Sequence, residues 1–262
     1  MTSLNSHGLR FAFGTLTALP VHVSRWDRGA ARAGMLCAPL AGLAVGLLAA
    51  VPGVLFLLGG SGPLLAAAAS AALPAALTRG LHLDGLADTA DGLGSAKPAE
   101  DALRIMKQSD IGPFGVITLL FVLLAQVAAL FELYGRSWAE GALGTVVAAV
   151  TARLALTLAS RRGVPPARPE GLGAAVAGTV PPRGAAAVAC AVVACSAAAG
   201  ALLGGYGAAL HHALAALAGL GAAQVMLRHC VRRFGGVTGD VFGAVEETAA
   251  TVALLALSLS LG

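Results

Sequence analysis

Three of the 13 acidic residues in this chain lie in one short segment, between His82 and Gly92. Asp84, Asp88 and Asp91 are spaced by four and three residues, and positions i, i+4 and i+7 of a helix share one face. Three carboxylates presented together repel one another unless a cation neutralises them. Oxygen ligands favour Mg²⁺, Mn²⁺ or Ca²⁺ over zinc, and Mg²⁺ typically combines a few carboxylates with substrate phosphates. The spacing therefore predicts a metal site for phosphoryl transfer.

Two other segments carry residues that could bind or activate a phosphate. Residues 235–240 read GGVTGD, and the backbone N–H groups of such a glycine-rich turn, at positions such as Gly236 and Thr238, can cradle an anion. Asp240 could complete a metal shell or act as a base, although a helix-capping loop has a similar sequence. Lys107 and Asp110 lie just before an apolar run. An interfacial linker with Lys107 facing lipid headgroups is the alternative for that segment.

The composition indicates that a membrane protein must position these residues. Apolar residues make up 57% of the 262 residues and charged residues only 11%, whereas soluble domains carry about 25% charged residues. Disorder requires the opposite balance, and the 35 glycines follow no collagen-like period of three. The net charge of +4 comes from scattered Arg residues with few aromatics, so we expect no nucleic-acid partner. The lipid bilayer is the expected surrounding.

Apolar runs long enough to span a bilayer predict about seven transmembrane helices in an all-α fold. They cover residues 35–58, 64–78, 114–134, 141–160, 184–205, 208–227 and 244–261. The second run is short and contains Pro74, so it could be broken or could stop inside the bilayer. Frequent Gly and Ala residues suit helices whose backbones approach closely in lipid. We expect a single membrane-embedded domain over residues 1–262, without a cleavable signal peptide.

The basic residues predict which side of the membrane each connection faces. With a cytoplasmic amino terminus, all of the 17 Lys and Arg residues except Arg136 and Arg153 fall in inner segments. This bias follows the positive-inside rule. The three segments that carry chemistry then share the cytoplasmic side. The four cysteines show neither metal spacing nor a disulfide framework, and we expect them to be small buried hydrophobic residues. They are Cys37, Cys190, Cys195 and Cys230.

The membrane surroundings bear on which function the acidic segment has. A solvated helix end, with its acids paired to Arg79 and Arg104, would be favoured in a soluble protein. Acids at membrane depth are costly and usually functional, which favours the metal site. A transporter's proton or cation pathway would predict acids in the middle of several spans. The sequence has almost none outside this cluster and the span ends.

Four motifs in one order resemble the cobalamin synthase family, the adenosylcobinamide-GDP ribazoletransferases. They are HLDGLADTADG (82–92), IMK and IGPFG (within 105–115), ARPEGLG (167–173) and GGVTGD (235–240). The segment TLTALP (15–20) is similar to that family's amino-terminal segment, and the resemblance covers about residues 10–250. One departure is visible, because many members carry an acid where this chain has Gln108.

The resemblance implies a Mg²⁺-dependent enzyme of the cell membrane, with its active site on the cytoplasmic side. Such an enzyme joins adenosylcobinamide-GDP to α-ribazole, or to α-ribazole 5′-phosphate, and releases GMP. The expected partners are other corrinoid-assembly enzymes and further copies of this chain in a homo-oligomer. The chemistry parallels that of CDP-alcohol phosphatidyltransferases, but their Ala-Arg pair after Asp-Gly is missing after Asp84-Gly85. A lipid-headgroup transferase is therefore the alternative function, ahead of a transporter.

Phosphoryl transfer requires positioning and charge neutralisation more than covalent help from the protein. We expect Asp84, Asp88 and Asp91 to hold one or two Mg²⁺ ions and, with Asp240, to be the catalytic residues. Substrate contacts are expected from basic residues, from His82 and from the glycine-rich turn. These candidates are Arg79, Lys107, Arg153, His82, Gly236 and Thr238. Each basic side chain could instead anchor a helix at the interface, and His82 could simply pack there.

Overall fold

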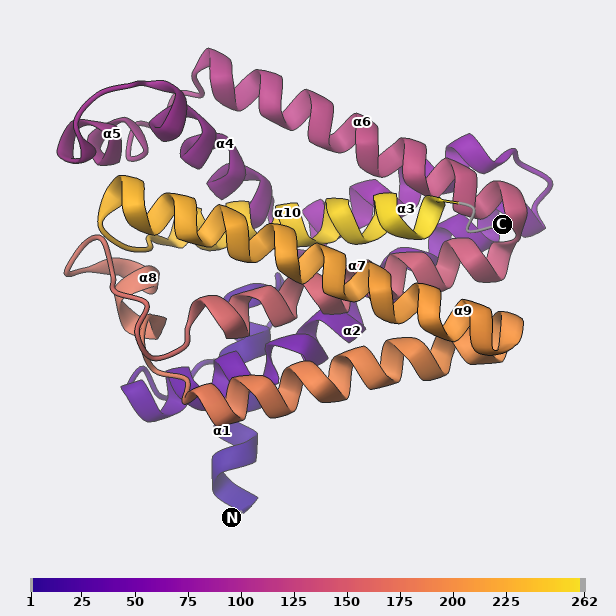
Figure 1. The fold of residues 1–262 in the computed structure, drawn as a ribbon, viewed down its shortest axis with the longest axis horizontal. Coiled ribbons are helices and arrows are strands. Elements are labelled where there is room, and N and C mark those ends of the chain that lie inside the picture. Colours follow the sequence, from indigo (N-terminus) through magenta and orange to yellow (C-terminus); the bar gives the residue numbers. More distant parts are fainter. Residues whose placement is uncertain (1, 260–262) are drawn as a thin grey trace.

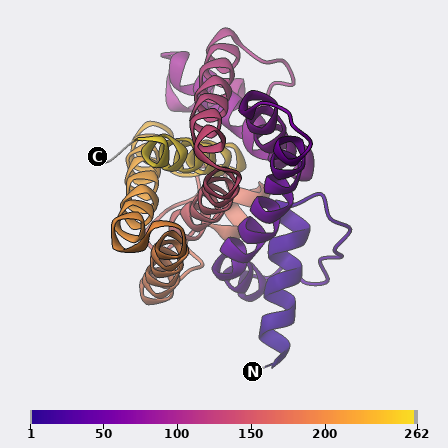
Figure 2. The same ribbon diagram turned by 90° about the vertical axis from the view of Figure 1, so that its right-hand side faces the viewer.

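In the computed structural model, which describes residues 2–259, every regular element is a helix (Figure 1). An all-α polytopic membrane protein is thus confirmed. The helices are α1 (Thr2–Leu16), α2 (Arg28–Leu58), α3 (Pro63–Leu77), α4 (Leu81–Gly94), α5 (Ala99–Ile105), α6 (Pro113–Arg136), α7 (Trp138–Ala159), α8 (Gly171–Val176), α9 (Pro182–Phe234) and α10 (Gly239–Ser258). Figure 2 shows the bundle nearly end on, with α9 and α10 on one side and α1 and α2 on the other.

Five of these helices are long and apolar enough to cross a membrane, namely α2, α6, α7, α9 and α10. Helix α9 has 53 residues, or about 80 Å of helix, whereas the hydrocarbon core measures about 30 Å. Its backbone is non-helical at Gly204 and Gly205, and its two halves run antiparallel (Figure 1). These halves correspond to the predicted spans 184–205 and 208–227. The total of seven crossings stays a prediction.

The short second span ends in a sharp bend. Helix α3 stops at Leu77, and α4 leaves it at an angle of 88°. Arg79 and Gly80 make this turn with left-handed φ angles of +55° and +71°. A left-handed Gly costs little, because it has no Cβ, whereas Arg79 is an uncommon residue in that region. The bend turns α4 away from α3, so the acidic segment is a separate helix.

Small residues let the central helices approach one another. A Cβ on Gly42 of α2 would lie 2.5 Å from the carbonyl oxygen of Ala149 on α7, and one on Gly46 would lie 2.9 Å from Cα of Val146. Two glycines four residues apart therefore seat α2 against α7, as in membrane helix pairs with small residues at the contact. Thr157 of α7 adds a hydrogen bond of 2.6 Å to the carbonyl oxygen of Met35.

The bundle has one end rich in short elements. Helices α4, α5 and α8 lie there, together with both ends of α9 and the start of α10 (Figure 1). Most of the basic residues belong to segments at this end, so the helix arrangement agrees with the predicted charge bias. The cytoplasmic placement of this end stays a prediction. The carboxyl end of the last predicted span, at residues 260–261, lies outside the described residues.

The prediction that the cysteines are buried is wrong for two of them. Cys190 and Cys195 are exposed on the first half of α9, whereas Cys230 is buried and Cys37 is partly buried. The outer surface of a membrane bundle faces lipid, so an apolar helix position there needs no protein neighbour. The apolar sequence pattern could not separate the two environments.

Asp91, on the last turns of α4, contacts the start of α6. Its Oδ2 accepts a hydrogen bond of 2.7 Å from the backbone N–H of Gly112, and its Oδ1 accepts one of 3.0 Å from Gly115. Asp91 is only 7% exposed, and a Cβ on Gly112 would lie 2.4 Å from its carboxylate. The first N–H groups of a helix lack intrahelical partners and attract an anion. Asp91 therefore joins α4 to α6.

Replacing Asp91 with Ala should lower the stability of the folded protein by about 2 kcal/mol, because one buried and one part-buried N–H group lose a charged acceptor. A loss of this size corresponds to a melting temperature about 5 °C lower, measurable by thermal unfolding in detergent. Asp84→Ala is the matched control, because it removes an acid from the same helix without touching α6. Equal melting temperatures for Asp91→Ala and the unaltered protein would contradict the capping role.

Candidate active site

Two glycines bring α4 against the first turns of α10. A Cβ on Gly85 would lie 2.7 Å from the carbonyl oxygen of Asp240, and one on Gly243 would lie 2.7 Å from that of His82. Only glycine permits backbones this close. The acidic segment and the GGVTGD segment, which are about 150 residues apart in sequence, are consequently neighbours in space. Asp240 lies in the first turn of α10, which begins five residues before the predicted span.

The ARPEGLG segment packs on the other side of the glycine-rich turn. The backbone N–H of Ala167 donates to the carbonyl oxygen of Val237, and the N–H of Val237 donates to that of Pro165, both at 2.9 Å. Gly236 fits between them, since a Cβ there would lie 2.5 Å from the nitrogen of Ala167. This pairing carries Arg168 towards Asp240, with 3.9 Å between Nη1 and Oδ2.

An open cleft of about 840 Å³ lies beside α4 at this end of the bundle. Its walls come from the carboxyl end of α1, the α3–α4 bend, α4, and the loop between α5 and α6. The lining residues are Thr15, Thr17, Thr78, Arg79, Gly80, Leu81, Asp84, Ala87, Asp88, Met106, Lys107, Gln108, Ser109, Asp110, Ile111, Leu119 and Leu172. Two of the predicted catalytic acids and two of the predicted basic contacts therefore share one cleft.

The negative charges at the cleft are only partly compensated. Asp88 interacts electrostatically with the carboxylates of Asp240, Asp84 and Asp91, and Arg168 opposes them. Asp240 accepts a hydrogen bond of 3.1 Å from the hydroxyl of Thr238. Carboxylates this close without matching cations attract a positively charged ligand. The arrangement can therefore bind a cation and, through it, a phosphate.

The oxygen ligands at the cleft suit a hard divalent cation whose coordination shell is completed by substrate phosphates. Asp84 and Asp88 line the cleft one helical turn apart and supply carboxylate oxygens. Within residues 2–259, no three His, Cys, Asp or Glu side chains converge as a closed metal cage would require. Mg²⁺ usually relies on one or two carboxylates plus phosphates and water, so two acids at an open cleft fit it.

The three predicted metal ligands do not all face the cleft. Seven residues separate Asp84 from Asp91, which is about 10 Å along a helix axis. Asp91 therefore reaches beyond the cleft to the start of α6, where two N–H groups bind its oxygens. Helical periodicity identifies a shared face, but it does not say which neighbour each position on that face meets.

The structure divides the predicted substrate contacts into three groups. Arg79 and Lys107 line the cleft, and Lys107 also forms an exposed ion pair of 3.4 Å with Glu170. Thr238 is buried and caps α10, and Gly236 packs on residues 165–167, so both shape the loop before Asp240.

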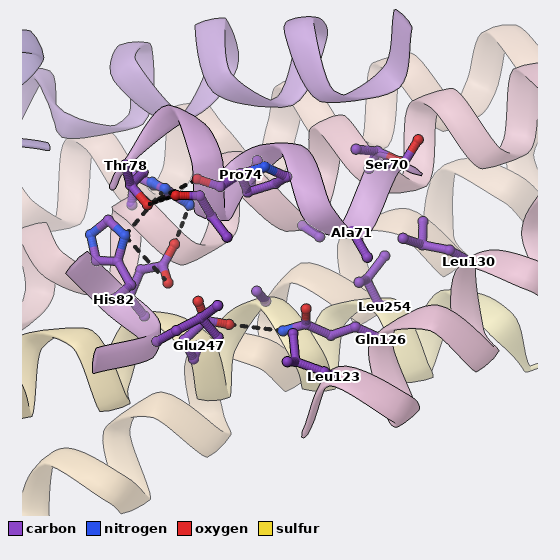
Figure 3. A pocket seen from close by; sticks show the side chains of 18 residues that line it. Ser70, Ala71, Pro74, Thr78, His82, Leu123, Gln126, Leu130, Glu247 and Leu254 are labelled. Atoms are coloured by element: carbon purple, nitrogen blue, oxygen red, sulfur yellow. Dashed lines mark hydrogen bonds and ion pairs between the residues drawn. The ribbon is translucent and has the colours of Figure 1, made fainter. Parts of the chain in front are cut away.

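His82 and Arg153 form the third group and lie away from the cleft. They line a small cavity of about 50 Å³ with Glu246 and Glu247, and Figure 3 shows His82 and Glu247 at this cavity.

Sequence reasoning missed several residues at this end of the bundle. Thr15 and Thr17 line the cleft, although their hydroxyls bond to carbonyl oxygens of α1. The only sequence feature that pointed to them was the similarity of their TLTALP segment to the amino-terminal segment of the family. Arg168 was counted only as part of the charge bias, although it lies in a motif. Glu246 gave no distinct signal beside Glu247.

Comparisons with known proteins agree with the motifs. The sequence model of the family described as cobalamin-5-phosphate synthase matches residues 8–258. A protein of Frankia casuarinae named adenosylcobinamide-GDP ribazoletransferase is 45% identical, over 96% of this chain and 94% of its own length. Proteins of the same name from a Nocardioides species and from Escherichia coli are 41% and 36% identical. The alignments cover 94% of this chain and 96% of the Nocardioides protein, and 92% and 95% for Escherichia coli.

No solved structure matches this chain significantly. The family match covers nearly the whole sequence and includes every segment that meets at the cleft end of the bundle. The chain belongs to the cobalamin-5-phosphate synthase family.

Proposed function

We propose that this chain joins adenosylcobinamide-GDP to α-ribazole, or to α-ribazole 5′-phosphate, and releases GMP. Family membership and the shared name of the relatives support the reaction. The observation that carries the assignment of the site is the cleft of about 840 Å³, in which Asp84, Asp88, Arg79 and Lys107 meet. The cleft is open, so it can take the pyrophosphate and the adjoining parts of two substrates that extend beyond it.

The reaction exchanges one phosphorus–oxygen bond for another. A ribose hydroxyl of the ribazole forms a bond to the phosphorus attached to cobinamide, and the bond from that phosphorus to the oxygen bridging to GMP breaks. The hydroxyl proton leaves, and GMP departs with the bridging oxygen. The protein must hold the two substrates in line and balance negative charge.

Asp84 and Asp88 are the residues that we assign to a Mg²⁺ ion. When bound, the ion would neutralise the pyrophosphate and stabilise the leaving GMP. Both carboxylates come from one helix whose two ends contact other helices, so their separation is fixed by the fold. Asp91 supports them by holding α4 to α6.

The other residues of the site have roles that follow from their positions. Arg79 and Lys107 line the cleft and would contact phosphate oxygens. Asp240, held by Thr238 and facing Arg168, is our candidate for accepting the hydroxyl proton or for adding a metal ligand. Gly236 and Thr238 hold the loop that presents Asp240. The basic segments around the cleft support a cytoplasmic active site in the cell membrane.

Asp84→Asn and Asp88→Asn should each reduce turnover at least about 100-fold, because an amide is a poor ligand for Mg²⁺ and leaves the phosphate charge unbalanced. Membranes containing each variant are incubated with adenosylcobinamide-GDP, both ribazole forms and Mg²⁺, and GMP is measured chromatographically. Asp101→Asn, an exposed acid paired with Arg104 on α5, is the matched control and should retain activity. If either variant retained full turnover, the residue replaced in that variant would not be a metal ligand of the site.

The same assay tests the reaction itself. GMP should appear with at least one ribazole form. If the unaltered protein releases no GMP but transfers a headgroup from a CDP-alcohol to lipid, the lipid-headgroup transferase replaces the proposed function.

Chelation of divalent cations should abolish turnover, because the acids at the cleft need a counter-ion before a pyrophosphate can approach them. The measurement is GMP release after treatment with EDTA and gel filtration, followed by addition of Mg²⁺. Activity should return with Mg²⁺ and stay absent with Na⁺ at equal ionic strength. Undiminished turnover in EDTA would exclude the metal.

Lys107→Ala and Arg79→Ala should raise KM for adenosylcobinamide-GDP by about 5–20-fold, because each removes a charged hydrogen-bond donor to phosphate. The Lys107–Glu170 pair is exposed, so its loss should leave stability nearly unchanged. Steady-state kinetics measure KM, and thermal unfolding measures the stability of each variant. Glu170→Gln, which removes the partner of Lys107 but not the cation, is the control and should not raise KM.

A further inference from the structure

A buried charged cluster inside the bundle joins three helices. Arg153 of α7 donates a short hydrogen bond from Nη1 to Oε1 of Glu246 on α10, and their side chains are only 4% and 2% exposed. Nδ1 of His82, on α4, lies 3.4 Å from Nη2 of Arg153 and 4.0 Å from Oε2 of Glu246. Figure 3 shows His82 at one end of the cavity, with Glu247, which is hydrogen-bonded to Gln126, beside it.

Stability alone gives no reason for this cluster. Replacing a buried ion pair with apolar residues of similar volume is often neutral or stabilising, because desolvation offsets the attraction. Within residues 2–259, His82 Nε2 and Arg153 Nε also find no hydrogen-bond partner. Charged residues inside spanning helices are costly and usually serve a function. What distinguishes this cluster is that His82 lies two residues before Asp84.

Helix α4 packs on α10, α6 and α5, and small residues form much of this contact. Its packing on α10 includes Gly85 and Gly243, which allow the two backbones to approach closely. Its link to α3 is the bend at Arg79 and Gly80. Asp91 fixes the far end to α6. Near the other end of α4, the polar contacts come from His82.

Helix geometry connects this contact to the cleft. Each residue turns the helix by about 100°, so residues two apart point to nearly opposite sides. His82 therefore faces the buried cluster while Asp84, and Asp88 one turn later, face the cleft. A rotation of α4 that withdrew His82 from Arg153 and Glu246 would turn both acids away from the cleft.

We propose that His82, Arg153 and Glu246 are positioning residues, which set the rotation and register of α4 so that Asp84 and Asp88 point into the cleft. The catalytic purpose of this positioning rests on the proposed function. The positioning itself does not, and it can be measured without substrate.

The first measurement uses cysteine labelling in a background whose four native cysteines are replaced by Ala. Thr89, on α4, is 1% exposed and is not among the residues that line the cleft, so a cysteine introduced by Thr89→Cys should react slowly with a water-soluble maleimide. His82→Leu, and the double variant Arg153→Met with Glu246→Leu, should each raise the labelling rate about 10-fold. The apolar pair keeps the volume and removes both charges, so it should still fold.

The second measurement is turnover in the native-cysteine background. Misplacing metal ligands through their supporting residues typically costs 10–100-fold in activity or metal affinity, so kcat should fall by about that factor. KM for adenosylcobinamide-GDP should change less than about 3-fold, because Arg79 and Lys107 are untouched. Raising Mg²⁺ should restore part of kcat, which it would not do for an unfolded protein. Arg153→Lys keeps the charge, so its kcat should lie between that of the unaltered protein and that of the apolar pair.

Tyr134→Phe is the matched control. It removes a buried hydrogen bond of 2.8 Å between Tyr134 of α6 and Ser70 of α3, without touching α4. Both the labelling rate and kcat should stay at the level of the unaltered protein.

Two results would overturn the proposal. One is slow labelling of the cysteine at position 89 together with unaltered kcat in His82→Leu and in the apolar pair. The other is fast labelling in Tyr134→Phe as well, which would indicate general loosening of the bundle. Should the apolar pair fail to reach the membrane, His82→Leu decides alone, because it leaves the ion pair intact. If the unaltered protein releases no GMP while the variants still label fast, the proposed function fails and the positioning stands.

Discussion

The close contact between α4 and the first turns of α10 is the constraint on which the rest of the site depends. Gly85 and Gly243 leave no room for a Cβ, so the two backbones touch and place Asp240 beside the acidic helix. The loop of residues 165–168 then packs on the glycine-rich turn and brings Arg168 to Asp240. A side chain at either glycine would separate all of these groups together.

Polar contacts hold α4 at positions outside its glycine contact with α10. Asp91 ties one end of α4 to the N-terminal N–H groups of α6, and His82 meets the Arg153–Glu246 pair near the other end. Between these contacts, Asp84 and Asp88 face an open cleft. In a chain with only 11% charged residues, three acids that look alike in sequence thus differ in position, since Asp91 holds the helix and Asp84 and Asp88 face the cleft.

Much of this arrangement could be predicted from the sequence, because lipid imposes strong patterns. The apolar runs coincide with the long helices, and the glycines at 204 and 205 separate the halves of α9 where two spans were predicted. The resemblance to the family rested on four motifs, and the family match confirmed it. Asp84, Asp88, Arg79 and Lys107 share the cleft, as expected of residues that act together.

What the sequence could not supply was the identity of neighbours across the bundle. The period of a helix predicted a common face for Asp91, but not that the start of α6 would lie against it. Arg153 was conspicuous as a cation inside a span, yet its partner Glu246 is 93 residues away. Cys190 and Cys195 sit in apolar sequence whether they face lipid or protein. Each of these contacts depends on how helices pack.

The most direct test of the central claim follows the phosphorus that changes partners at the cleft. Purified protein in lipid nanodiscs is given Mg²⁺, α-ribazole and adenosylcobinamide-GDP that carries ³²P only in the phosphoryl group attached to cobinamide. We predict that the label stays entirely in the corrinoid product and that the released GMP is unlabelled, with no transfer when Asp84 is replaced by Asn. Labelled nucleotide as the product, or equal transfer by the Asp84→Asn variant, would contradict the proposed chemistry and its site.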